Sequence, residues 1–157
     1  MNIWNEILGN QVLICAVVGW TVAQVLKTLI DLYLNRSFNP ERLFGSGGMP
    51  SSHSATVCAL TTASGIKYGA GSFEFAVSFV LSMIVMYDAT GVRWAAGLHA
   101  KAINDIVDYL GDESQHKEKI LNDMIPELNE SLGHRVIEVI CGALLGFSVA
   151  LIQFFFF

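Results

Sequence analysis

Four apolar segments separated by polar residues form the main pattern along the chain. They cover about 12–34, 54–68, 73–86 and 136–157. A helix needs about 20 apolar residues to cross a bilayer, and only the first and fourth segments reach that length alone. The second and third reach it if neighbouring polar residues continue their helices toward one membrane surface. We therefore expect one all-α domain, 1–157: an integral membrane helical bundle with about four transmembrane helices, at 12–34, 52–68, 73–93 and 135–157.

A polar insert, at about 94–132, separates the third and fourth segments. Apolar residues recur in it twice at helical spacing: Ile103, Ile106, Val107 and Leu110, then Ile120, Leu121, Met124 and Ile125. The pattern predicts one or two amphipathic helices outside the membrane core, lying over its surface as interfacial helices do.

The composition also favours a membrane environment. Hydrophobic residues make up 53% of the 157 and charged residues only 15%, whereas a soluble domain carries about a quarter charged residues. The net charge of −5 gives no basic surface for nucleic acid, so no such partner is expected. The three cysteines show no CxxC spacing, and we interpret them as reduced, buried thiols.

The first polar motif, residues 47–55, reads GGMPSSHSA and stands at the mouth of the second apolar segment. Gly48 and its neighbour free the backbone, and Ser51 or Ser52 is suited to cap a helix. Exposed amides at a helix N-terminus, together with hydroxyl groups, bind anions. His53 in that position can donate a proton to a leaving oxygen. The simpler alternative is an ordinary loop with a surface histidine.

The second polar motif, residues 87–93, reads YDATGVR and directly follows the third apolar segment. Asp88 and Arg93 are costly in lipid, so we expect them to face a protein interior or an aqueous pocket, with Thr90 as a supporting residue. The alternative is a simple cap at the membrane interface.

The third polar motif, residues 133–138, reads GHRVIE. His134 and Glu138 are four residues apart and share one face of a helix. A carboxylate in an otherwise apolar run needs a partner, and His134 is the nearest one. Such a pair orients the imidazole and leaves its other nitrogen free to attack phosphorus. A purely structural pair at the end of a helix is the alternative.

Further basic residues precede the first motif. Lys27 lies in the first apolar segment, four residues before Asp31, and either forms a salt bridge with it or reaches a phosphate. Arg36 and Arg42 lie on the connection that follows, and arginine is a good bidentate phosphate ligand. With four spans, all three motifs emerge at the same membrane face, and we expect them to form one pocket.

GGMPSSHSA, DATGVR and GHRVIEVICGALLG resemble the divergent branch of the type 2 phosphatidic acid phosphatase superfamily, which also includes vanadium-dependent haloperoxidases. The likeness runs from about Lys27 to Gly146. It implies a helical membrane phosphatase that forms a phosphohistidine without a metal or other cofactor. By this resemblance His134 is the nucleophile, Glu138 replaces the usual aspartate and His53 is the general acid. Ser51 donates to the phosphate, Ser52 offers its amide and Lys27 is the lysine of the family's first motif.

Three positions depart from the superfamily pattern. Leu34 and Leu128 stand where arginines are usual, and Trp94 stands where the divergent branch usually has a second basic residue. Arg36 or Arg42 then substitutes for the first arginine and Arg93 for the second.

These observations predict hydrolysis of a lipid phosphate or diphosphate, such as an isoprenoid phosphate, phosphatidic acid or phosphatidylglycerol phosphate. Phosphate or vanadate is the expected occupant of the anion site. Basic residues gather on the motif side, which the positive-inside rule places in the cytoplasm for a protein of the cell membrane. Small residues, Gly142, Ala143 and Gly146, suggest a face for a homodimer. Three alternatives remain open: a non-catalytic protein that binds a lipid phosphate, a small transporter and a vanadate-dependent oxidase.

Overall fold

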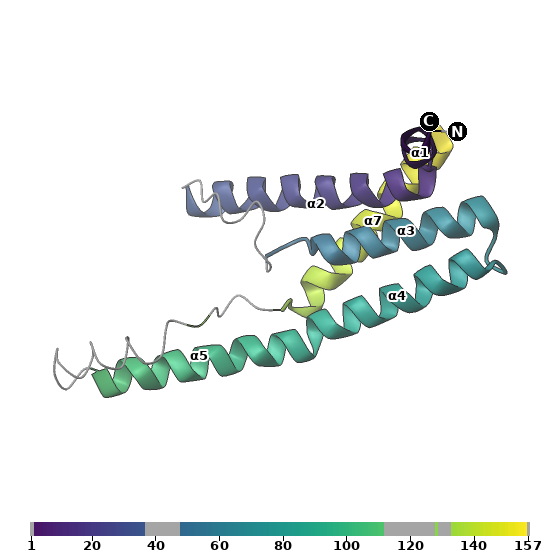
Figure 1. Ribbon diagram of the computed structural model, residues 1–157. Coiled ribbons are helices and arrows are strands. Elements are labelled where there is room, and N and C mark those ends of the chain that lie inside the picture. The colour runs from purple at the N-terminus through teal and green to yellow at the C-terminus, as the bar shows by residue number, and fades with distance from the viewer. Residues whose placement is uncertain (1, 37–47, 112–127, 129–132, 157) are drawn as a thin grey trace.

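The computed structural model describes residues 2–36, 48–111, 128 and 133–156. The regular structure of these residues is entirely helical, which confirms the predicted all-α class (Figure 1). The helices are α1 (Ile3–Leu8), α2 (Gln11–Asn35), α3 (Ser52–Tyr68), α4 (Phe73–Thr90), α5 (Val92–Gly111) and α7 (Val136–Phe156).

Helix α3 is the central element of the bundle and packs against α2, α4 and α7. Its buried residues are small for the most part: Ser52, Ser54, Ala55, Val57, Ala59, Ala63 and Ser64. The facing helices contribute glycines at the contacts. A Cβ atom on Gly146 would lie 2.1 Å from the Ala55 carbonyl oxygen, and one on Gly142 would lie 2.3 Å from the Ser51 carbonyl oxygen. Close backbone approach of this kind is how helices associate in lipid, where apolar side chains gain little from contact with each other.

This packing changes the basis of the expected homodimer. Gly142 and Gly146 were predicted to face another subunit, but both are buried against α3 within the same chain. The homodimer stays a prediction, without these two glycines as its surface.

Three helical stretches among the described residues are long and apolar enough to cross a membrane: Gln11–Leu34, Phe73–Tyr109 and Val136–Phe156. The stretches Gln11–Leu34 and Val136–Phe156 lie close to the first and fourth predicted spans, whereas Phe73–Tyr109 contains the third predicted span and continues past it through most of α5. The second predicted span coincides with α3, which has 17 residues and does not reach this standard. Its neighbours enclose it on several sides, so its small and polar residues meet protein more than lipid.

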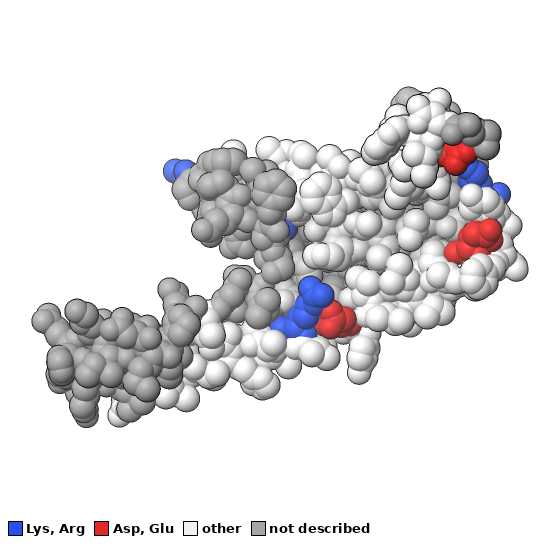
Figure 2. Space-filling model, viewed as in Figure 1, with Lys and Arg blue, Asp and Glu red and all other residues white. Residues whose placement is uncertain are grey.

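The outer surface of the bundle is apolar. Large hydrophobic side chains are exposed along all three spanning helices, among them Val17, Leu29, Phe79, Ile84, Ile140 and Leu144. Figure 2 shows a wide surface without charged side chains between charged groups at the two ends of the bundle. Such an arrangement matches an apolar bilayer core with water on both sides.

Helix α5 contains the first amphipathic run of the polar insert, and it begins within the predicted third span rather than after it. A break at Gly91 separates it from α4, and it then runs on past the ends of α2 and α3 (Figure 1). It therefore extends away from the bundle (Figure 1). We had expected an interfacial helix that lies over the pocket. The second predicted run, at about 116–128, lies outside the described residues except for Leu128.

Candidate active site

The first motif forms the N-terminus of α3, as predicted. Ser51 is the N-cap, and its Oγ accepts hydrogen bonds from the Ser54 amide at 3.4 Å and from the Ser54 hydroxyl at 3.0 Å. Ser51 and Ser52 are both buried. Their side chains belong to the helix start and do not line the cavity described below, whereas His53 does.

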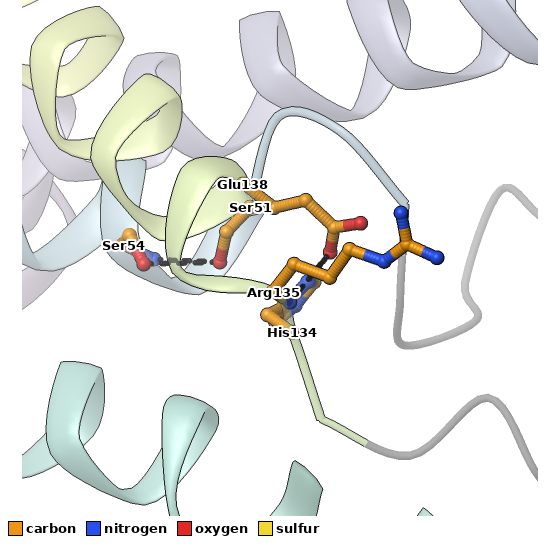
Figure 3. Close-up of polar contacts among 5 residues, drawn as sticks. All are labelled: Ser51, Ser54, His134, Arg135 and Glu138. Carbon is orange, nitrogen blue, oxygen red and sulfur yellow. Dashed lines mark hydrogen bonds and ion pairs between the residues drawn. The ribbon is translucent and has the colours of Figure 1, made fainter.

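The third motif holds a histidine–carboxylate pair at the start of α7. The Nδ1 atom of His134 lies 2.9 Å from Oε2 of Glu138, and only 5% of the His134 side chain is exposed. The same Oε2 accepts the Arg135 amide at 3.3 Å, so Glu138 also caps the helix (Figure 3). With Nδ1 donating to the carboxylate, Nε2 is the nitrogen left for chemistry.

The second motif interrupts the helix between α4 and α5. The Arg93 Nε atom donates to Asp88 Oδ2 at 2.5 Å, so an ion pair spans the break at Gly91. Thr90 turns its hydroxyl back to the Met86 carbonyl oxygen at 3.0 Å. The ion pair therefore orients Arg93, while Thr90 supports the end of α4.

Two main-chain hydrogen bonds join the three motifs. The Ser51 amide donates to the Glu138 carbonyl oxygen at 3.0 Å, and the His134 amide donates to the Ala89 carbonyl oxygen at 2.9 Å. The third motif is thus bonded to each of the others, and the structure brings together residues more than eighty positions apart in the sequence.

A small cavity of about 100 Å³ lies where the motifs meet. Its lining consists of His53, Val85, Asp88, Ala89, Arg93, Gly133 and His134. Both predicted catalytic imidazoles therefore border one space. Helices α3, α5 and α7 all begin beside it, and the N-terminus of a helix carries a partial positive charge.

The electrostatic environment of His53 is cationic. Burial lowers the pKa of its imidazole, and the positive charges of Arg93 and Lys27 lower it further. Lys27 is 3% exposed on α2, so its charge is directed into the protein and away from lipid. An anion in the cavity would meet Arg93 and the helix N-termini, whereas Lys27 is not part of the cavity lining and acts there only through its charge.

The remaining predicted residues lie around this centre. Gly48, which precedes the α3 cap, has a φ of +85°. Arg36 ends α2 and is exposed, away from the cavity lining. Arg42 lies outside the described residues. Among the described residues, no three His, Cys, Asp or Glu side chains gather closely enough to hold a metal ion.

Three residues of the lining were missing from the sequence prediction: Val85, Ala89 and Gly133. Ala89 acts through its carbonyl oxygen, and Gly133 through a backbone conformation with a φ of +80°. Main-chain roles of this kind leave little trace in a single sequence. The one available signal was the glycine placed directly before His134.

Comparison with known proteins agrees with the membrane fold and the resemblance of the motifs. The uncharacterized membrane protein YuiD of Bacillus subtilis (strain 168) is 36% identical over 156 residues, which cover 97% of this chain and 99% of that protein. No solved structure matches. With its membrane-spanning helices the chain is a multi-pass membrane protein. A model described as the divergent PAP2 family matches residues 8–149, and the chain therefore belongs to the divergent PAP2 family.

Proposed function

We propose that this protein is a membrane phosphatase that hydrolyses a lipid phosphate or diphosphate through a phosphohistidine at His134. The observation that carries the proposal is one small cavity bordered by His53, Arg93 and a His134 that is paired with Glu138. A nucleophile oriented by a third group, a proton donor and a cation are the three parts that such a reaction requires.

In the first step, Nε2 of His134 attacks phosphorus opposite the leaving oxygen and forms a P–N bond. The P–O bond to the lipid breaks as protonated His53 gives its proton to the departing oxygen. Arg93, Lys27 and the helix N-termini stabilise the negative charge of the transferring group. Glu138 stabilises the imidazolium that forms at His134.

In the second step, neutral His53 takes a proton from water as the water oxygen attacks phosphorus. The P–N bond breaks, inorganic phosphate leaves and both histidines return to their starting states. The position of the cavity, at the end of the spanning helices, suits a substrate with its phosphate in water and its chain in the bilayer.

One observation favours a second candidate, a protein that binds a lipid phosphate without turnover. Leu128 stands where the superfamily usually carries an arginine, and its amide and carbonyl groups are bonded to the Asn104 side chain at 3.0 and 2.9 Å. The position thus contributes no charge to the site, and Arg93 has to supply it.

Purified protein assayed against a panel of lipid phosphates without added metal tests the proposal. We expect the wild type to release inorganic phosphate and vanadate to inhibit it. Arg93→Ala should lower kcat/KM by about 10- to 100-fold, less than for an enclosed donor because Arg93 is half exposed. Lys67→Ala, at the opposite end of α3, should match the wild type. Binding without release would favour the second candidate, and neither binding nor release would overturn both.

We also propose that the protein lies in the cell membrane with the cavity on the cytoplasmic side. Lys101 and Arg135 belong to the cavity side, whereas Lys67 lies at the other end, and cytoplasmic loops carry an excess of basic residues. Both chain termini lie together away from the cavity (Figure 1), so this orientation places them outside.

Cysteine labelling tests this orientation in a chain whose three native cysteines have been replaced. In intact cells, an impermeant maleimide should label Gly71→Cys, in the turn between α3 and α4. Lys101→Cys, on α5, should react only after the membrane is permeabilised. The opposite pattern would reverse the orientation.

A further inference from the structure

We infer that the break between α4 and α5 positions the His134 nucleophile. Gly133, which packs against this break, acts as the positioning residue. The inference rests on the proposed role of His134 and adds a function for the second motif. In the proposed reaction itself, that motif supplies only Arg93 and its partner Asp88.

The break makes a main-chain acceptor available. The Gly91 amide donates to the Tyr87 carbonyl oxygen at 2.9 Å and closes α4, and the Gly91 carbonyl oxygen accepts the Ala95 amide at 2.9 Å and opens α5. In an uninterrupted helix the Ala89 carbonyl oxygen would accept the amide four residues later, that of Arg93. Here it accepts the His134 amide instead.

Gly133 lets the chain come close enough for that bond. It lies against the first turn of α5: a Cβ atom would be 2.3 Å from the Trp94 nitrogen and 2.6 Å from the Arg93 carbonyl carbon. Its φ of +80° lies in the left-handed region, which glycine adopts without steric cost. Any other residue would push the segment away from α5 and lengthen the bond from His134 to Ala89.

His134 is consequently held at two points by two different elements. The end of α4 binds its amide, and Glu138 of α7 binds its ring at Nδ1. Both contacts are needed to aim Nε2, because a ring fixed only at Nδ1 still moves with its backbone. The same break carries the Asp88–Arg93 ion pair, so one interruption places both the nucleophile and a cation at the cavity.

Alanine substitutions at two glycines distinguish a loss of His134 positioning from the ordinary cost of backbone strain. Gly69 has a φ of +88°, and a Cβ atom added to it would meet no atom within 4 Å, so Gly69→Ala shares the conformational cost without the clash. Gly133→Ala carries both the conformational cost of the positive φ and the clash of the added Cβ atom. We expect Gly133→Ala to lower kcat by about 100-fold, the scale of a misplacement of about 1 Å, with KM changed by less than about threefold. Gly69→Ala should leave both constants unchanged.

A second readout does not depend on turnover. In histidine-selective NMR of the purified protein, Gly133→Ala should shift the His134 ring nitrogen resonances, because the Nδ1 contact to Glu138 changes. Gly69→Ala should not shift them. A wild type that releases no phosphate would defeat the proposed function. The comparison of His134 resonances between the two variants would still decide whether Gly133 fixes the position of the imidazole.

A folded Gly133→Ala protein with wild-type kcat and unshifted ring resonances overturns the inference. If that variant fails to fold, Gly91→Ala replaces it, because alanine favours a continuous helix and so returns the Ala89 carbonyl oxygen to the Arg93 amide. Loss of kcat with a shifted His134 resonance supports the inference, and wild-type values for both contradict it.

Discussion

Replacing His134 with alanine should abolish phosphate release, with a loss in kcat of at least about 10³-fold. The substitution removes the atom that forms the covalent bond to phosphorus, and no neighbouring group replaces it. Losses of a nucleophile are among the largest effects that single substitutions have in enzymes that use a covalent intermediate. Phosphate release by the purified variant in detergent, under saturating lipid phosphate, measures it.

A companion variant makes the result specific to the mechanism. His53→Ala should slow both steps, and the second step should become limiting when the substrate has a good leaving group that needs little protonation. The phosphoryl group should then remain on His134, visible as its added mass on the peptide containing that residue. His99→Ala is the matched control, since His99 is exposed on α5 and does not line the cavity; it should behave as the wild type. A His134→Ala protein with undiminished turnover would exclude the phosphohistidine.

Gly146→Leu should destabilise the bundle by about 3 kcal/mol or more, at or above the upper end of the range for overpacked cores. The reason is the contact of α7 with α3, where even a Cβ atom would lie 2.1 Å from the Ala55 carbonyl oxygen and 2.9 Å from the Ala59 nitrogen. Both opposing atoms belong to the backbone of α3, so no side-chain rotation relieves the clash. The two helices must separate, and α3 is the central element on which the bundle depends.

Unfolding of the purified protein by a denaturing detergent, followed by circular dichroism, measures this loss. Ser148→Leu is the matched control on the same helix, because Ser148 is exposed and leucine at a lipid-facing position adds apolar surface where it is tolerated. It should unfold close to the wild type. Equal stability of the Gly146 and Ser148 variants would show that the close approach of α7 to α3 is not needed.

Several features of the fold follow from local patterns in the sequence. Long apolar runs interrupted by few charges predict spanning helices, because a bilayer leaves no water to satisfy a backbone outside a helix. Serine before an apolar segment predicts the cap of α3, and spacing of four residues predicts the pair of His134 and Glu138. The GGMPSSHSA, DATGVR and GHRVIE strings predict the family, which the comparisons confirm.

Other features depended on contacts between segments distant in the sequence. The role of α3 as a shared inner helix, and of Gly142 and Gly146 as its contacts, depends on which faces meet, and small residues predict only that some close contact exists. The homodimer face inferred from these glycines illustrates the point, since the same pattern serves packing within one chain or between two.

The sequence by itself determined that this chain spans a membrane as helices, belongs to the divergent PAP2 family and carries a histidine–carboxylate pair. Only the tertiary structure decided which residues of the motifs line the cavity, that the Ser51 side chain stays out of this lining and that the Ala89 carbonyl oxygen holds His134. The physical reason is that local spacing sets which side chains share a helix face. The meeting of three helix ends, by contrast, depends on packing and on main-chain groups that every residue carries alike.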